Sequence, residues 1–141
     1  MYVKPDILKT VCELLQEPRA NCHLAPISTW ADKHRTAWSA PLHYANPLGD
    51  DPGETCNFPG KGGWDGKKNA NVLDAIKNVT SVLQRWVDKE ASEAAASEAL
   101  KFLVHFVGDM HQPMHLVAKA KGGNLVKVLF GDETSENYYS P

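Results

Sequence analysis

The chain has 141 residues, enough for one domain with a modest core, and a formal net charge of −2. No broad basic field is therefore available to hold nucleic acid or anionic lipid, and a nucleic-acid partner would have to be held locally, by metal ions or a few arginines. No run of about 20 apolar residues exists, so no membrane-spanning helix is predicted. The opening MYVKPD has no apolar stretch of the kind found in signal peptides, so no signal peptide is expected in this chain.

The first half of the chain predicts two helices and a long irregular segment. Apolar residues recur at helical spacing over 5–17, after a proline that suits a first helical turn. Residues 27–38 predict a second helix, with Ser28 or Thr29 as its cap. Residues 39–69 contain four prolines and many glycines, which indicates irregular structure. A loop this long in a compact domain is usually functional or held by a crosslink.

The second half is more strongly helical. One helix is predicted from Asn71, and another over 90–110, which is alanine-rich at its start and apolar at its end. The GGN triplet at 122–124 indicates a turn, and 125–130 predicts one short strand. The polar residues 132–141 predict an irregular tail. We therefore expect a single, mainly α domain with one short strand or hairpin after GGN.

The three cysteines, Cys12, Cys22 and Cys56, cannot all pair within the chain. They are either free, partly buried thiols or part of a secreted chain that lacks a partner cysteine. Asn78 begins an Asn-Val-Thr triplet, an acceptor sequence for N-glycosylation. Such triplets arise often by chance, so this one supports secretion only weakly.

The stretch LVHFVGDMHQPMHL, residues 103–116, places three histidines and an aspartate in an apolar run. Buried polar side chains need partners, because an unpaired one is energetically costly. His105 and Asp109 lie four residues apart, so they share a helix face and form a natural chelate for a divalent metal. The alternative is that His105 is a hydrogen-bonded core residue with no ligand role.

The other two histidines of this stretch are interpreted separately. His115 lies ten residues beyond His105, a rise of about 15 Å on a straight helix. Either Pro113 redirects the chain or His115 serves a second metal. His111 and His115 form a rival pair, but Pro113 disturbs that face, and His111 falls about 200° around the helix from Asp109. We interpret His111 as a surface residue.

Two segments before residue 50 offer further ligands. WADKHR contains Asp32, and APLHYAN contains His43 in a proline-bounded loop. Two imidazoles and two carboxylates suit Zn²⁺, and Asp109 has a second oxygen free to bridge another ion. The complete predicted set is Asp32, His43, His105 and Asp109.

Five segments carry a family resemblance that covers about residues 5 to 131: WADKHR (30–35), PLHYAN (41–46), NVLDAIKNVT (71–80), EALKFLVHFVGDMHQPMH (98–115) and GGN (122–124). In this order they resemble the secreted, zinc-dependent, single-strand-specific nucleases of the nuclease S-one and P-one type. Plant bifunctional nucleases belong with them, and bacterial zinc phospholipase C is a distant relative. The resemblance implies a phospholipase C/P-one nuclease-like fold, mostly helical, around three zinc ions. It also implies an endonuclease or 3′-nucleotidase acting on single-stranded DNA and RNA.

The resemblance also implies roles for single residues. The predicted set of four holds one zinc, Asp109 bridges to another, and His115 matches a ligand of a third. Arg35 matches an arginine that steadies the phosphate, so the implied catalytic residues are Arg35, Asp32 and Asp109. An ion pair with Asp32 is the alternative for Arg35.

Three further residues match positions that bind substrate in the family. Tyr44 matches the aromatic on which a base stacks, although simple loop packing is an alternative. Asn46 stands where many members carry an aspartate that reads the base edge. Asn124 matches a polar residue of the cleft. The resemblance thus implies single-stranded nucleic acid or nucleotides as substrate, a secreted protein and a monomer.

The sequence also departs from the family pattern. Members begin with a tryptophan whose amine and carbonyl bind zinc, followed by a histidine, and neither is present here. After GGN they carry an NLHxxWD-type segment, where this chain reads ENYYSP. We therefore expect a chain truncated at both ends, with one complete zinc site and no cysteine left to pair with Cys56. The alternatives are a zinc-binding remnant without turnover and a phospholipase C-like hydrolase.

Overall fold

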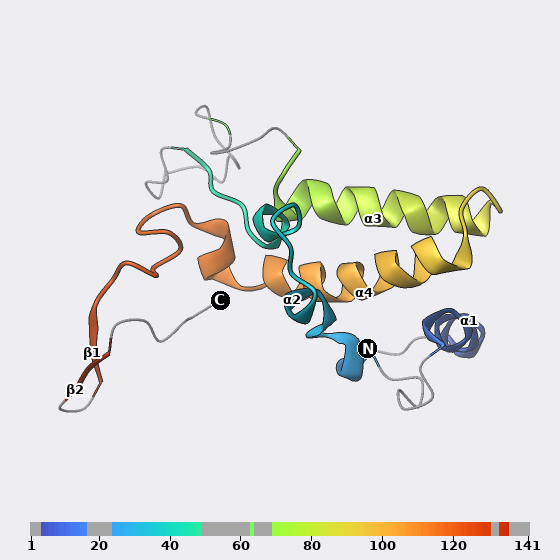
Figure 1. Cartoon of the computed structure of the whole chain (residues 1–141), viewed down its shortest axis with the longest axis horizontal. Coiled ribbons are helices and arrows are strands. Elements are labelled where there is room, and N and C mark those ends of the chain that lie inside the picture. The colour runs from blue at the N-terminus through green and yellow to red at the C-terminus, as the bar shows by residue number, and fades with distance from the viewer. Residues whose placement is uncertain (1–3, 17–23, 49–62, 64–68, 131–132, 136–141) are drawn as a thin grey trace.

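Two long helices form the centre of the computed structural model, which describes residues 4–16, 24–48, 63, 69–130 and 133–135. Helices α3 (Val72–Val87) and α4 (Glu93–Met110) lie side by side and run in opposite directions (Figure 1). The predicted mainly α class is confirmed. Within the described part of the chain, no helix is both long and apolar enough to cross a membrane.

Side-chain caps fix where both long helices begin. The Asn71 side chain accepts hydrogen bonds from the backbone N–H groups of Leu73 and Asp74, each at 3.0 Å. The Ser92 hydroxyl accepts one from the N–H of Ala95 at 3.2 Å. These bonds satisfy amides that have no partner inside the helix. The helix predicted from Asn71 is therefore present, and α4 begins three residues later than predicted.

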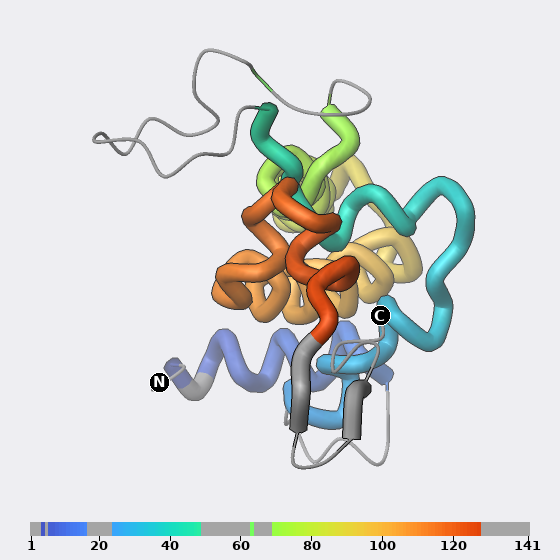
Figure 2. The backbone as a smooth tube through the Cα atoms, turned by 90° about the vertical axis from the view of Figure 1, so that its left-hand side faces the viewer, coloured from blue at the N-terminus to red at the C-terminus, as the bar shows by residue number. Residues whose placement is uncertain are grey.

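Helix α1 (Pro5–Leu15) packs against the first part of α4, and Figure 2 shows it running below the α3–α4 pair. The helix predicted over 5–17 is thus present but ends at Leu15, followed by Gln16 in a left-handed conformation. Cys12 of α1 is disulfide-bonded, so the free-thiol interpretation is wrong for this residue. The core at this end of α4 consists of Leu14, Leu15, Ile27, Ala96 and Leu100.

The single helix predicted over 27–38 is wrong. The only α-helix in this fully described segment is the four-residue α2 (Trp30–Lys33), which lies between two 3₁₀ turns, η1 (Ala25–Ile27) and η2 (Ala40–His43). Thr36 and Ser39 explain the break. The Ser39 hydroxyl accepts a hydrogen bond from the Thr36 N–H at 2.9 Å, and the Thr36 hydroxyl accepts one from the Ser39 N–H at 3.4 Å. Such local bonds compete with those of a helix. Thr29 precedes α2, but its side chain makes no capping hydrogen bond.

After α4 the chain turns through η3 (Pro113–Leu116) and a series of turns that includes GGN. It then forms an antiparallel hairpin of β1 (Val128–Phe130) and β2 (Glu133–Ser135), with Phe130 opposite Glu133. The predicted strand is present but shorter, and the tail predicted to be irregular contains β2. The other tail residues, most of the 39–69 segment, Cys22 and Cys56 lie outside the described residues.

A second core lies beneath the turns that follow α2. Phe102 and Phe106 of α4 stack at 5.2 Å, and Trp30 meets Phe102 edge-on at 5.3 Å. The buried members of this core are Ala31, Ala45, Val72, Ala75, Phe102 and Phe106. This packing holds α2 and η2 against the second half of α4. The segments that carry Asp32 and His43 are thereby brought to the helix that carries His105 and Asp109.

Candidate metal centre and cleft

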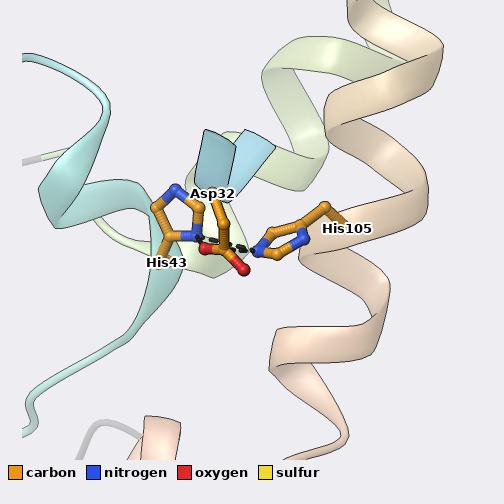
Figure 3. Close-up of side chains that lie close together, drawn as sticks. All are labelled: Asp32, His43 and His105. Carbon is orange, nitrogen blue, oxygen red and sulfur yellow. Dashed lines mark hydrogen bonds and ion pairs between the residues drawn. The ribbon is translucent and has the colours of Figure 1, made fainter. Parts of the chain in front are cut away.

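Four potential ligands from three elements meet at one point. Asp32 comes from α2, His43 from the end of η2, and His105 and Asp109 from α4. Figure 3 shows Asp32, His43 and His105 pointing toward one another. His43, His105 and Asp109 are buried, whereas the Asp32 side chain is 53% exposed. The centre is therefore closed on the α4 side and open toward solvent at Asp32.

The ligand atoms of Asp32, His43 and His105 lie within 4.8 Å of one another, as the ligands of one ion do, and Asp109 lies beside the two histidines. His43 Nδ1 lies 3.0 Å from His105 Nε2, and Asp109 Oδ2 lies 3.0 and 3.2 Å from these two nitrogens. Asp32 Oδ1 lies 3.3 Å from His105 Nε2 and 3.7 Å from His43 Nδ1. Around a zinc ion with bonds of about 2.0–2.1 Å, tetrahedral ligand atoms are about 3.3–3.4 Å apart. Asp32, His43 and His105 are thus arranged as a possible metal-binding group, with the Asp109 carboxylate next to both imidazoles.

The backbone orients His105 for this role. Its Nδ1–H donates a hydrogen bond of 2.6 Å to the carbonyl oxygen of Ser28, just before α2. This bond fixes the ring and turns Nε2 toward Asp32, His43 and Asp109. Histidine ligands of metals are typically held by such a bond from the other ring nitrogen.

The protonation of the buried pair shows how strongly the centre favours positive charge. Burial lowers the pKa of His105, but hydrogen bonds to Asp109 and to the Ser28 carbonyl outweigh it and raise the pKa from 6.5 to about 9. Burial raises the pKa of Asp109, but hydrogen bonds from His105 and His43 lower it from 3.8 to about 2. Without a metal, a proton on His105 supplies the cation that the carboxylates require. A divalent ion would replace that proton.

The two oxygens of Asp109 face different partners. Oδ2 faces His43 and His105, whereas Oδ1 lies 3.3 Å from Nδ1 of His115. Helix α4 ends at Met110, and η3 turns the chain so that His115 returns toward Asp109. His115 Nδ1 is buried and has no partner of hydrogen-bond geometry in the described part of the chain. This nitrogen and Oδ1 could therefore contribute to a second ion.

His111 points elsewhere. It is exposed, and its Nδ1–H donates a 2.6 Å hydrogen bond to the carbonyl of Val107 one turn earlier. The structure thus keeps His111 out of the cluster, on the surface where the helix spacing predicted it. Asn78 lies on the exposed side of α3, likewise away from the cluster.

A cavity of about 560 Å³ opens beside the metal centre. Most residues singled out from the sequence lie in its wall, whereas His105, His111 and Asn78 are not among its lining residues. Arg35 is exposed there, and among the described contacts it forms no ion pair with Asp32. The predicted residues that line the cavity are Asp32, Arg35, His43, Tyr44, Asn46, Asp109, His115 and Asn124.

Other wall residues were not singled out from the sequence. Gln112 caps η3 by accepting a 3.3 Å hydrogen bond from the N–H of Met114, and Lys121 and Gly122 also line the cavity. Lys121 immediately precedes the GGN turn, but a single lysine beside two glycines is not a recognisable sequence motif. Its place in the cavity wall is evident only from the structure.

Comparison with known proteins agrees with this geometry. The sequence model of the S1/P1 Nuclease family matches residues 1–139. The chain belongs to this family. The residues that converge in the structure are those on which the resemblance rested.

Individual relatives agree with this assignment. The chain is 37% identical to Nuclease P1 of Penicillium citrinum over 143 residues, which cover 99% of this chain and 50% of the relative. It is 38% identical to Endonuclease 2 of Arabidopsis thaliana over 128 residues, with coverage of 85% and 42%. It is 28% identical to Nuclease S1 of Aspergillus oryzae over 139 residues, with coverage of 93% and 45%. The chain thus spans about half the length of the curated relatives it matches.

Proposed function

We propose that this protein is a zinc-dependent endonuclease or 3′-nucleotidase that hydrolyses phosphodiester bonds of single-stranded DNA and RNA. One observation carries the proposal: a possible metal-binding group of two imidazoles and a carboxylate, with a second carboxylate beside it, borders a cleft whose wall also carries a cationic and an aromatic side chain. The names of its relatives as nucleases and endonucleases support the same reaction class.

The residues divide into ion holders and phosphate binders. Asp32, His43, His105 and Asp109 would hold the zinc ion. The chemistry that a bound zinc ion supplies is Lewis acidity, which polarises phosphoryl oxygens and makes water a competent nucleophile near neutral pH. Arg35 would donate charge-assisted hydrogen bonds to the phosphate and stabilise the charge that develops on it.

The proposal also includes recognition of the nucleic-acid bases. Tyr44 is 36% exposed in the cleft wall, so its ring can receive an unpaired base. Stacking of this kind tolerates any base and requires a strand that is not paired. Asn46 lies in the same wall and offers both a hydrogen-bond donor and an acceptor to the base edge.

We also propose that the cluster continues beyond one ion. Asp109 Oδ1 and the unpartnered His115 Nδ1 are the start of a second site, which needs at least one more ligand. This arrangement agrees with the family expectation of several zinc ions.

Secretion and a monomeric state form part of the proposal. The disulfide at Cys12 favours an oxidising compartment, and the exposed Asn78 is accessible for glycosylation. Expression in a secreting eukaryotic host would test this assignment. The medium should contain a chain that loses mass on removal of N-glycans and elutes as a monomer.

The central experiment measures zinc content and hydrolysis in the same preparation. The purified chain, loaded with zinc and dialysed, should retain at least one zinc and cleave single-stranded DNA while leaving a duplex of the same sequence intact. Phosphocholine release from lipid vesicles would point instead to a phospholipase C-like hydrolase. Zinc binding without cleavage would leave the non-catalytic remnant and refute the proposed activity.

A further inference from the structure

The cleft has a second cationic residue that none of the family motifs includes. Lys121 lines the cavity, as does Arg35. Among the residues that the structure describes, the acidic side chains of the wall are Asp32 and Asp109 and the permanently basic ones are Arg35 and Lys121. Both acids belong to the metal cluster, so Arg35 and Lys121 are the wall charges left for an anionic ligand.

The loop that carries Lys121 is held in a defined conformation. Ala120, Lys121, Gly122 and Gly123 all adopt positive φ angles, between 52° and 85°. The side-chain amide of Asn124 donates a 2.8 Å hydrogen bond to the Lys121 carbonyl. Backbone hydrogen bonds within the loop close its turns; for example, the N–H of Leu125 donates to the carbonyl of Ala120 at 3.0 Å. Lys121 is therefore presented from a fixed backbone.

The same loop is fitted closely to the segment that carries His115. A Cβ atom built on Gly122 would lie 2.5 Å from the carbonyl oxygen of Met114, so only glycine allows this approach. Met114 immediately precedes His115 in η3. The position of Lys121 is thus set relative to the metal cluster by direct packing.

We propose that Lys121 binds a phosphate of the bound single strand other than the one that is cleaved, and so acts as a positioning residue. This inference rests on the proposed function. A flexible ammonium group on the rim gives a point-charge contact to a backbone phosphate. Such a contact is equally strong before and during bond cleavage, so it contributes to substrate binding and not to the rate of the chemical step. Asn124 is then a support for the Lys121 loop, since its amide is bonded to the carbonyl of that residue.

The test compares Lys121→Gln with Lys121→Arg and with Lys77→Gln in the zinc-loaded chain. Lys77 is an exposed lysine on α3 whose ion pair with Asp74, at 3.4 Å, is a surface one. Hydrolysis of oligothymidylate should show a KM about fivefold higher for Lys121→Gln with kcat unchanged, and near-normal values for the other two. Binding of an uncleavable phosphorothioate analogue of this oligonucleotide, followed by fluorescence anisotropy at several salt concentrations, should show a log–log salt slope smaller by about 0.7 for Lys121→Gln.

The two measurements separate this inference from the proposed function. If the zinc-loaded chain cleaves the strand but Lys121→Gln has the same KM and salt slope as the parent, Lys121 makes no phosphate contact. A fall in kcat at unchanged KM would also overturn the inference, because it would assign Lys121 to the chemical step. If no chain cleaves the strand, the proposed function fails, and the anisotropy slopes alone decide whether Lys121 contacts phosphate.

Discussion

The two halves of the metal centre are built in different ways. His105 and Asp109 are one turn apart on α4, an 18-residue helix, and their relative position follows from helix geometry alone. Asp32 and His43 come from a four-residue helix and a 3₁₀ turn, and nothing local sets their separation. A rigid helix thus supplies half of the ligands, and tertiary packing brings the other half to it. Substitution of a ligand should therefore weaken zinc binding strongly, whereas substitution of a residue that supports a ligand should weaken it less.

The largest effect is expected from Asp109→Ala. Asp109 contacts His43 and His105 through one oxygen and His115 through the other. Its loss therefore removes the carboxylate that these three histidines share. Zinc affinity should fall by more than about 100-fold, as measured by competition with a chromophoric chelator. The matched control is His111→Ala, two residues along, which should leave the affinity unchanged. Equal losses in the two variants would refute the assignment of their helix faces.

Removal of zinc should distinguish the two regions directly. A bound ion ties the turns that carry Asp32 and His43 to α4, whereas α4 keeps its own hydrogen bonds and core packing. Chelation should therefore speed amide hydrogen exchange in residues 30–46 roughly tenfold, with a smaller change in residues 96–109. Mass spectrometry of peptides from the two regions provides the measurement. Equal acceleration in both would show that α4 itself depends on the metal.

Tyr44 tests whether the loop region also binds substrate. Tyr44→Ala should raise KM for a single-stranded oligonucleotide roughly tenfold, because the loss of a stacked base costs about 1–3 kcal/mol. Tyr44→Phe retains the ring and should behave like the parent chain. Zinc affinity, measured in parallel, should be unchanged in both variants. A similar KM for the alanine and phenylalanine variants would leave Tyr44 a residue of loop packing.

The smallest effects on stability and zinc binding should come from substitution of Ser39, which is buried, and of Ser92, which caps α4. The fully buried Ser39 braces the turn before His43, whereas Ser92 caps the start of α4, far from the ligands. Each change to alanine should lower the free energy of unfolding by about 1 kcal/mol in urea denaturation. Only Ser39→Ala should also weaken zinc binding. Weaker zinc binding in Ser92→Ala would mean that the positions of His105 and Asp109 depend on the start of α4 and not only on the local helix geometry.

The sequence predicted the helical half of the site better than the loop half. The spacing of His105 and Asp109 and the helical periodicity of both segments are local signals, so α3 and α4 could be anticipated. The cap at Ser92 was not recognised, and the predicted start of α4 was therefore three residues early. The break of the predicted 27–38 helix was missed, although the Thr36 and Ser39 hydroxyls that compete with helical hydrogen bonds are also a local signal.

Two features of the centre also depend on long-range contacts. The carbonyl of Ser28 that orients His105 is a backbone group, and any residue type would supply it. The position of His115 depends on how η3 turns the chain after α4. The sequence therefore left two explanations open for His115, and the approach of Asp109 Oδ1 favours a role at a second ion.

The walls of the cleft are joined to one another through main-chain atoms. The N–H of Ala45 donates a 2.7 Å hydrogen bond to the carbonyl of His115, and the N–H of Val72 donates one of 3.0 Å to the carbonyl of Tyr44. Side-chain identity does not enter these links. The side chains at positions 44 and 46 can therefore change during evolution while the backbone links between the walls of the cleft are kept.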